Sequence, residues 1–503
     1  MAEDKKPELY QAPAVVKPSM DELQAISTDL KLKCTQEELE TFHEMFSMTC
    51  KSYQIVNQLP EPQLPVGKNS IPFSASCYFG KDDVVTSWNE RVLRNFDRPS
   101  SHRYVVTVYW RCEIKGAEEG ILKGKTVGIK DSIPVAGVPM MDGSKILEGY
   151  TPEFDATVVT KVLDAGGTIL GKAVCEDLCH TGSSWSSSTG PVKNPHDKTI
   201  SSGGSSSGCA SLVARGKIDI AIGGDQGGSV RTPASACGIV GLKPTFGSVP
   251  YTGAVSMEVT IDHLGPMART LEDGISCKRI GLLREGFEGA EPEVDRCVRE
   301  AAKRLTESGA TVEEVSIPAH NQISAVHSVV ALEGAYACMT GGNAGHQWQG
   351  HYPTSLQEAL TRGSIVRPHD QPLTVKMMSL WSEYVKRNYQ CKFYGKAQNI
   401  RRALVKAYDD VLKEYDGLIM PTLPMKPLKL PTVGCSTKEL LQLSFGMITN
   451  TAHFNITGHP ALSIDTGLSE DHIPVGMMII GRKFDDMTVL QIARAYEKIR
   501  DGE

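Results

Sequence analysis

The sequence predicts an α/β protein, in which a mixed β-sheet is covered by helices on both faces and a helical N-terminal domain precedes it. Three observations lead to this fold class. Short apolar runs alternate with helical patterns from about residue 105 to the C-terminus, which is typical of an α/β core. Many of these runs are apolar at nearly every position, as in 474–480, and such strands are buried on both faces. The first 95 residues, by contrast, show a helical pattern.

The N-terminal helical segment begins with a capping box, since Thr35 is followed three residues later by Glu38. Apolar side chains then recur at helical spacing, at Leu39, Phe42, Phe46 and Cys50. Prolines from Pro60 onward and a polar run around Pro99 break this pattern. We therefore predict a helical domain over residues 1–95 and an α/β domain over 96–503.

Within the α/β part, β-branched and apolar runs predict strands and 3.6-residue periodicity predicts helices. The expected strands are 104–109, 126–130, 168–171, 219–222, 278–283, 311–315, 417–421, 461–464 and 474–480. The expected helices are 155–165, 207–215, 294–305 and 487–499. The strand at 219–222 leads directly into the turn Gly227-Gly228-Ser229, so we expect Ser229 to follow a strand end.

Composition narrows the function classes. Lys and Arg number 53 against 59 Asp and Glu, which gives a net charge of −6 without a basic patch, so nucleic acid is not the expected partner. The 13 cysteines, an odd number without framework spacing, are expected to be free thiols of a reducing compartment. No signal sequence and no run of eighteen apolar residues is found. We therefore expect a cytoplasmic protein, without a membrane segment, that acts on a small molecule.

The turn Gly227-Gly228-Ser229 places one hydroxyl directly after two glycines. Two glycines let backbone N–H groups converge on one point and let a substrate approach the main chain closely. A serine-rich loop at 203–208 precedes the turn, and Lys130 lies further upstream. Together these features indicate a serine hydrolase that uses no histidine.

The Ser/Gly-rich region 181–208 has other interpretations. Its composition is typical of a flexible linker, although Trp185 and Pro191 interrupt it and favour a folded loop. Residues 204–208 match G-x-S-x-G, which would make Ser206 the nucleophile of an elbow, but the preceding residues are polar where an elbow needs a strand. A phosphate loop is the third alternative; it is weak because Ser229 stands where that loop needs a lysine.

A metal site would need clustered ligands, and the local candidates are Cys175, Glu176, Asp177, Cys179 and His180. No second pair follows them at zinc spacing. A buried cysteine pair is therefore the preferred interpretation. The sequence predicts neither a metal nor a cofactor.

Several linked motifs resemble the amidase signature family: Lys130-Asp131, Gly203 to Gly208, Gly227 to Arg231, and Gly238 to Thr245. Ser205 precedes Ser229 by 24 residues, which is the interval that those enzymes keep between their two catalytic serines. The resemblance extends to the C-terminal helix. Within the family it is strongest to bacterial amidases of broad specificity, enantioselective and often of nitrile pathways, that carry a helical N-terminal extension.

The resemblance implies an amidase that hydrolyses carboxylic amides to an acid and ammonia or an amine. Ser229 would attack the carbonyl and form an acyl-enzyme, Ser205 would relay the proton, and an uncharged Lys130 would accept it. A free lysine has a pKa of about 10.4, so Lys130 must be buried or lie near positive charge to be neutral. The apolar strand 126–130 provides such burial.

The resemblance also assigns the oxyanion hole and substrate-binding role to the backbone of Gln226, Gly227 and Gly228, and it places Ser205 after a cis peptide bond. It calls for no metal and no cofactor. Asp225 and Arg231, which flank the turn, are expected to hold its backbone in place. The histidines are expected to be structural or to line the pocket.

Other functions stay open: a glutaminase-type subunit of an amidotransferase complex, a fatty-acid-amide-type hydrolase, or a non-catalytic binding protein. The expected partner is a small-molecule amide substrate, and a homodimer is an assembly that the sequence allows. The chain departs from the family pattern at one place, since only Leu271 to Cys277 bridges a segment that is longer and helical in relatives. Loss of that cover would expose apolar sheet surface, so it bears on stability more than on chemistry.

Overall fold

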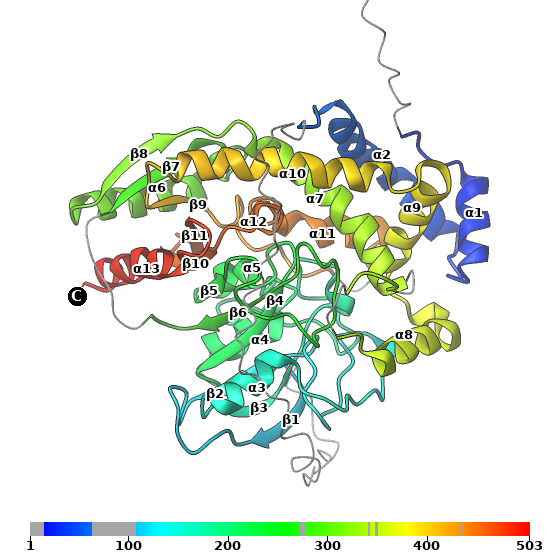
Figure 1. Ribbon diagram of the computed structural model, residues 1–503, viewed down its shortest axis with the longest axis horizontal. Coiled ribbons are helices and arrows are strands. Elements are labelled where there is room, and N and C mark those ends of the chain that lie inside the picture. The colour runs from blue at the N-terminus through cyan, green and yellow to red at the C-terminus, as the bar shows by residue number, and fades with distance from the viewer. Residues whose placement is uncertain are drawn as a thin grey trace, which may run out of the picture.

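A computed structural model describes residues 15–62, 107–271, 278–340, 343–347, 351–432 and 434–502. Eleven strands in these ranges form one sheet. They are β1 (Val108–Ile114), β2 (Thr126–Lys130), β3 (Thr168–Ala173), β4 (Ile220–Asp225), β5 (Val240–Lys243), β6 (His263–Ala268), β7 (Arg279–Leu283), β8 (Thr311–Val315), β9 (Gly417–Pro421), β10 (Ala461–Leu468) and β11 (Pro474–Ile480). Their order in the sheet is β1-β3-β2-β4-β6-β5-β10-β11-β9-β7-β8, from the bottom of Figure 1 to its upper left.

The sheet is mixed, as the sequence predicted. The strands β3, β2 and β4 are parallel to one another, and so are β9, β7 and β8 at the other end. The strands between them, from β6 to β11, pair antiparallel with their neighbours. Strand β11 is buried at all seven positions, which fits its continuous apolar run because both of its faces are covered.

Thirteen α-helices accompany the sheet in the described part of the chain. They are α1 (Met20–Asp29), α2 (Gln36–Gln58), α3 (Thr157–Asp164), α4 (Ser207–Ala214), α5 (Arg231–Cys237), α6 (Pro292–Glu307), α7 (His320–Ala335), α8 (Thr354–Val366), α9 (Leu373–Tyr389), α10 (Lys392–Val411), α11 (Thr437–Phe445), α12 (His453–Thr457) and α13 (Asp486–Asp501).

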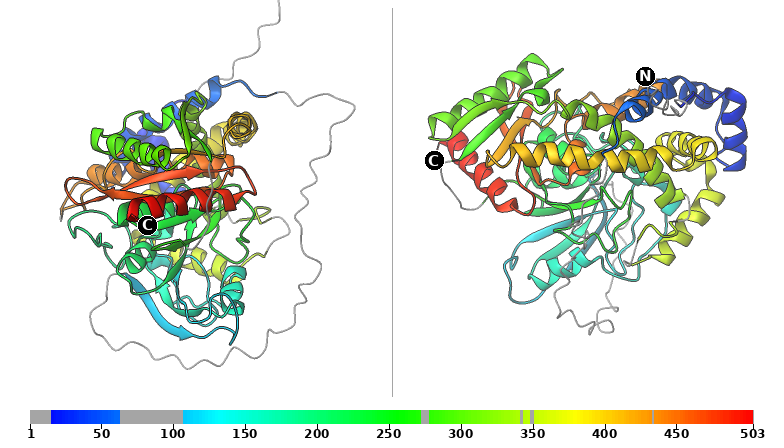
Figure 2. Two further views of the ribbon diagram at one scale, coloured as in Figure 1. Left: turned by 90° about the vertical axis from the view of Figure 1, so that its left-hand side faces the viewer. Right: turned by 45° about the horizontal axis from the view of Figure 1, so that its top comes forward.

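Helices cover both faces of the sheet. Helix α5 lies so close to one face that a Cβ on Gly476 of β11 would meet the Ser235 side chain at 2.3 Å. From the opposite face, Ile492 of α13 lies against Gly417 of β9. Two helices also cover the β2–β4 region. Helix α3 packs on one set of strand side chains there, and α4 packs on a different set. Figure 2 shows α13 lying along β10 and β11.

The helices of the N-terminal segment pack on α7, α9 and α10 (Figure 1). Helix α2 begins with the predicted capping box: the Thr35 hydroxyl accepts the Glu38 N–H at 3.1 Å, and the Glu38 carboxylate accepts the Thr35 N–H at 2.8 Å. Its apolar face is buried, with Phe46 5.1 Å from the Trp381 ring. The division at residue 95 stays a prediction, because residues 63–106 lie outside the described residues.

Helix α7 continues through a π-helical turn to Thr340, and this segment, His320–Thr340, is the one membrane-span candidate in the described ranges by length and composition. It packs against α2, α10 and α12, and 56% of its apolar window is buried. Those contacts are typical of a core helix. They give no indication of a membrane segment.

Two further expectations have a defined outcome. The strand expected at 104–109 begins at Val108 and runs to Ile114, while residues 104–106 lie outside the described residues. The connection from Leu271 to Cys277 is also outside them, apart from Leu271. Strand β4 is longer than predicted and continues through both glycines to Asp225, because β6 pairs with it along that whole length.

Candidate active site

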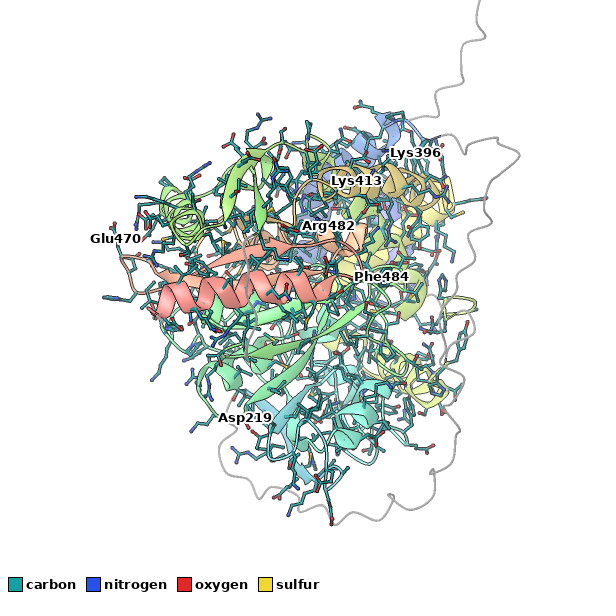
Figure 3. The ribbon with its side chains drawn as sticks, turned by 60° about the vertical axis from the view of Figure 1, so that its left-hand side comes forward. Asp219, Lys396, Lys413, Glu470, Arg482 and Phe484 are labelled. Atoms are coloured by element: carbon teal, nitrogen blue, oxygen red, sulfur yellow. The ribbon has the colours of Figure 1, made fainter. Side chains whose placement is uncertain are left out.

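The site lies at the edge of the sheet where β2 and β4 end. These strands are parallel neighbours, so their carboxyl ends meet at one edge. The carboxylate of Asp219, labelled in Figure 3, accepts the Thr126 N–H at 2.8 Å and the Thr126 hydroxyl at 2.7 Å, which joins the starts of the two strands. In this register Ile129 pairs with Ile222, and the amine of Lys130, the last residue of β2, reaches the Gly224 carbonyl oxygen near the end of β4.

The Ser/Gly-rich region is a folded loop and not a linker, and it is buried throughout 200–208 and at every position of 181–187 except Ser186. The carboxylate of Glu176 accepts hydrogen bonds from three of its hydroxyls, at 2.7 to 3.0 Å, from Thr181, Ser183 and Ser186. The Gly204–Ser205 peptide bond is cis, as the resemblance implied. A side chain at Gly204 would put its Cβ 1.7 Å from the Ser183 carbonyl oxygen, so only glycine fits there.

Lys130 and Ser205 meet at the centre of this site. Lys130 Nζ lies 2.7 Å from Ser205 Oγ and 3.3 Å from the Gly224 carbonyl oxygen. Both side chains are fully buried. Ser206, the alternative nucleophile, points its hydroxyl to the Gly224 carbonyl at 3.2 Å and follows a loop instead of a strand, so the elbow interpretation is wrong.

Three acidic side chains, Asp142, Cys175 and Cys179, lie beside Lys130 and are called here the thiol cluster. Both thiols donate to Asp142 Oδ1, each at 3.3 Å, and the Cys179 thiol is also in hydrogen-bond contact with Ser205. All three residues are buried. Their convergence was missed from the sequence because Asp142 lies 33 residues before Cys175.

The thiol cluster changes the electrostatics expected for the lysine. Burial lowers the pKa of the Lys130 amine, but the thiol cluster raises it, and the resulting pKa lies above its ordinary value. Within the cluster, burial raises the pKa of Asp142 and of Cys175 well above the usual range. The hydrogen bond from Cys175 and the charge of Lys130 hold the pKa of Cys179 well below its own. The burial predicted for Lys130 is present, and the charge of the cluster opposes its effect.

The Asp225 side chain binds the backbone of the turn that carries Ser229. The Asp225 carboxylate accepts the Gly228 N–H at 2.8 Å and the Val230 N–H at 3.1 Å. In the described part of the chain, the Gln226, Gly227 and Ser229 N–H groups have no protein acceptor and the Ser229 hydroxyl has no hydrogen-bond partner. Of the three backbone donors expected from the resemblance, Gly228 is thus already engaged.

Asp225 and Arg231 form a buried ion pair. The guanidinium donates to both carboxylate oxygens, at 2.9 and 3.1 Å, and neither side chain is exposed. Burial raises the pKa of Asp225, but the charge and hydrogen bonds of Arg231, with a hydrogen bond from Asn455, outweigh it and hold that pKa well below its usual range. These contacts fix the turn backbone, which is the scaffold role that the sequence suggested.

Other residues of the site were not found from the sequence. The Thr451 hydroxyl donates to the Gly227 carbonyl at 2.7 Å, and His327 Nε2 lies 3.0 Å from the Gln226 carbonyl oxygen. The Gln226 side chain donates to the Tyr251 hydroxyl at 2.7 Å. Thr451 belongs to a segment that resembled the family, but no pattern in the sequence linked it to the turn 224 residues earlier.

Comparison with known proteins agrees with this geometry. The sequence pattern of the family Amidase matches residues 109–277 and 275–490. The chain is 42% identical to an enantioselective amidase of Rhodococcus rhodochrous over 79% of this chain and 83% of that protein. It is 35% identical to a glutamyl-tRNA(Gln) amidotransferase subunit of Methanosarcina mazei over 77% of this chain and 87% of that one.

The fold is similar to the crystal structure of a glutamyl-tRNA(Gln) amidotransferase subunit of Thermotoga maritima, with a TM-score of 0.62 and 30% identity. That match covers 78% of this chain and 87% of the other. The family pattern covers most of the described α/β part, and the relatives are similar over more than three quarters of the chain. Both findings identify the family of this chain. The chain belongs to the amidase family, the amidase signature enzymes, and is an amidase.

Proposed function

We propose that this amidase hydrolyses carboxylic amides to a carboxylic acid and ammonia or an amine through an acyl-enzyme on Ser229. The observation that supports it best is the buried contact of 2.7 Å between Lys130 Nζ and Ser205 Oγ. A buried amine beside a hydroxyl is a base with a proton path. The backbone joins this pair to the nucleophile, because the Ser206 N–H donates to the Ser229 carbonyl at 3.2 Å.

The proposed reaction begins when Ser229 Oγ attacks the amide carbon. The Ser229 proton passes to Ser205 Oγ while the Ser205 proton passes to Lys130 Nζ. The tetrahedral intermediate then breaks its C–N bond, and the leaving nitrogen takes the proton back through Ser205. Water attacks the resulting ester by the same path, which releases the acid and restores Ser229.

The oxyanion of the intermediate is proposed to bind backbone N–H groups of the Gln226-Gly227-Gly228-Ser229 turn. The free donors are those of Gln226, Gly227 and Ser229, whereas the Gly228 N–H helps to hold the turn through Asp225. Such preorganised donors stabilise the charge that develops in the transition state. Gly228 retains a role in shape, because its φ is 129° and a Cβ there would lie 2.0 Å from the Thr451 hydroxyl oxygen.

Lys130 must be unprotonated when the substrate reacts. The thiol cluster, together with Cys209, raises its pKa. The lysine is therefore a stronger base when the thiol cluster is charged and is more readily neutral when the cluster is protonated.

The test of this function is the pair Ser229→Ala and Ser206→Ala. Ser229→Ala should abolish turnover of simple aryl and alkyl amides. Ser206→Ala should keep most of it, because the Ser206 side chain bonds only the Gly224 carbonyl and the substitution keeps the Ser206 N–H. Wild-type turnover by Ser229→Ala would contradict the proposal. A panel of amides from short aliphatic to aryl to long-chain would then define the substrate class, including the fatty-acid-amide alternative.

A second candidate function is that of an amidotransferase component, in which ammonia released at Ser229 passes to a substrate held by a partner. It is favoured by the 35% identity to the glutamyl-tRNA(Gln) amidotransferase subunit of Methanosarcina mazei. Size-exclusion chromatography separates the two. An active homodimer supports the stand-alone enzyme, and activity that requires other co-purifying chains supports the complex.

A further inference from the structure

The thiol cluster is the one group of three metal-ligating side chains whose donor atoms converge in the described part of the chain. Asp142 Oδ1 and the two sulfur atoms of Cys175 and Cys179 lie within 4.8 Å of one another. Asp142 Oδ2 is buried and has no hydrogen-bond partner among the described residues. A buried carboxylate oxygen without a partner is costly, and a ligand would satisfy it.

Local backbone structure holds the three donors together. Asp142 adopts a φ of 47°, and its carbonyl accepts the Leu178 N–H at 2.9 Å. Leu178 and Cys179 also adopt positive φ angles, of 48° and 60°. Cys175 lies two residues after the end of β3. The three ligands thus come from a turn, a strand end and a short 3-10 segment that are bonded to one another.

The spacing fits a thiophilic ion. Zn–S bonds of about 2.3 Å and Zn–O bonds of about 2.0 Å place sulfur and oxygen roughly 3.5 Å apart in a tetrahedral site. The two sulfur-to-oxygen distances are both 3.3 Å, so each would need to lengthen by only about 0.2 Å to accommodate an ion. Two thiolates with one carboxylate favour Zn²⁺ or Cd²⁺ over Mg²⁺ or Ca²⁺.

We infer that Asp142, Cys175 and Cys179 form an inhibitory binding site for a thiophilic divalent cation next to the catalytic residues. Binding forms two metal–sulfur bonds and one metal–oxygen bond, and the remaining thiol protons leave to the buffer. This differs from the sequence-based expectation of no metal. That expectation rested on the lack of a second Cys or His pair at zinc spacing, and it did not consider Asp142. The inhibitory part rests on the function proposed above.

Inhibition follows from the position of the cluster. A tetrahedral ion with three protein ligands takes a fourth from the nearest remaining donor. We assign this fourth position to the Ser205 hydroxyl, which is in hydrogen-bond contact with Cys179. Coordination would withdraw the Ser205 lone pair from Lys130 and interrupt the proposed proton relay. The ion would therefore lower kcat with little effect on the binding of the amide.

The experiment titrates the full-length, chelator-treated protein with ZnCl₂ and CdCl₂ by isothermal calorimetry, and follows the thiolate-to-cadmium absorption in the ultraviolet. We expect one ion per chain. Cys175→Ser and Cys179→Ser should each weaken binding roughly 100-fold, because each removes a direct ligand. Two control variants remove thiols outside the cluster and should leave binding unchanged: Cys237→Ser, which is buried, and Cys391→Ser, which is exposed.

X-ray absorption at the zinc edge of the wild-type protein supplies a measurement that needs no variant, and two sulfur ligands are expected. If the wild-type protein binds no zinc or cadmium, or if both cluster variants bind the ion as tightly as the wild type, the proposed metal site is wrong. Bound ion with full amidase turnover would overturn the inhibitory role. Because calorimetry and absorption do not depend on turnover, a protein that binds zinc but hydrolyses no amide would sink the proposed function and leave the metal site standing.

Discussion

Lys130 Nζ lies 2.7 Å from Ser205 Oγ in a fully buried environment. A second buried lysine, Lys172, lies on the adjacent strand β3 but is engaged differently. Its amine lies 3.4 Å from Asp131 Oδ1 and donates to the Ile133 carbonyl at 2.6 Å. Lys130 thus contacts a hydroxyl, whereas Lys172 contacts a carboxylate. We therefore assign a reactive role to Lys130 and a structural role to Lys172.

Replacement of Lys130 by methionine should therefore remove activity while the fold persists. Loss of a general base costs roughly 100- to 10,000-fold in rate, and methionine keeps most of the buried volume. Initial rates on an aryl amide measure the loss, and thermal melting checks the fold. Equal turnover of Lys130→Met and the wild type would exclude Lys130 as the base.

Lys172→Met is the matched control. It leaves the buried Asp131 carboxylate without its ion pair, which costs about 3–5 kcal/mol. We expect a lower free energy of unfolding in urea and, in the folded fraction, turnover close to that of the wild type. A Lys172 variant that melts normally and has lost its activity would show that the two lysines do not have these separate roles.

Gly204 tests the shape of the loop. An added methyl would lie 1.7 Å from the Ser183 carbonyl oxygen, so Gly204→Ala must displace the loop that positions Ser205. We expect a loss of about 1–3 kcal/mol of stability together with loss of activity. Gly395→Ala in α10 is the control: it has open space around it and should stabilise the protein by about 1 kcal/mol. Full activity of Gly204→Ala would contradict the rigidity assigned to the loop.

The buried pair of Asp225 and Arg231 should contribute to stability more than any surface pair. Asp225→Asn leaves the buried Arg231 charge uncompensated, and we expect the free energy of unfolding to fall by about 3–5 kcal/mol. The exposed pair of Arg296 and Glu300 is the comparison, where Glu300→Gln should change it by less than about 1 kcal/mol. Similar effects of the two substitutions in urea denaturation would argue against the scaffold role.

His320 should make the protein less stable at acid pH. Burial lowers the pKa of its imidazole to about 4, against about 6.5 in an unfolded chain. The unfolded state therefore takes up a proton first, so this stability contribution is complete above about pH 6.5 and is lost as the pH falls toward 4. His320→Gln should flatten that part of the curve of unfolding free energy against pH. An unchanged slope would show that His320 does not titrate in this range.

The sequence was sufficient for elements with strong local signals. The strands 417–421 and 474–480 were predicted at their observed bounds, because their apolar runs end at clear turn residues. The strands β5 and β6 were not predicted, since each is short and contains glycine or proline, and their partners are distant in sequence. The helices from α7 to α12 were not predicted either, because tertiary packing more than local periodicity sets their ends.

The residues of the site also fall into those that a local motif indicates and those that only the fold brings together. Lys130, Ser205 and Ser229 each stand in a motif of neighbouring residues, so the sequence could point to them. The position of Asp142 depends on how separate loops fold onto one edge of the sheet, which no local pattern encodes. The Gly228 to Asp225 hydrogen bond spans only three residues, but it depends on the conformation of the turn, which the motif did not specify. For this reason the charge beside Lys130 and the engaged Gly228 donor became visible only in three dimensions.

The central claim, that Ser229 is the nucleophile served by Ser205 and Lys130, is tested most directly by covalent labelling. A fluorophosphonate probe should modify one serine, and peptide mass spectrometry should place the label on Ser229. Labelling should fall sharply in Lys130→Met, because the unactivated hydroxyl reacts slowly. A label on Ser206 or any other serine, or undiminished labelling of Ser229→Ala, would contradict the account.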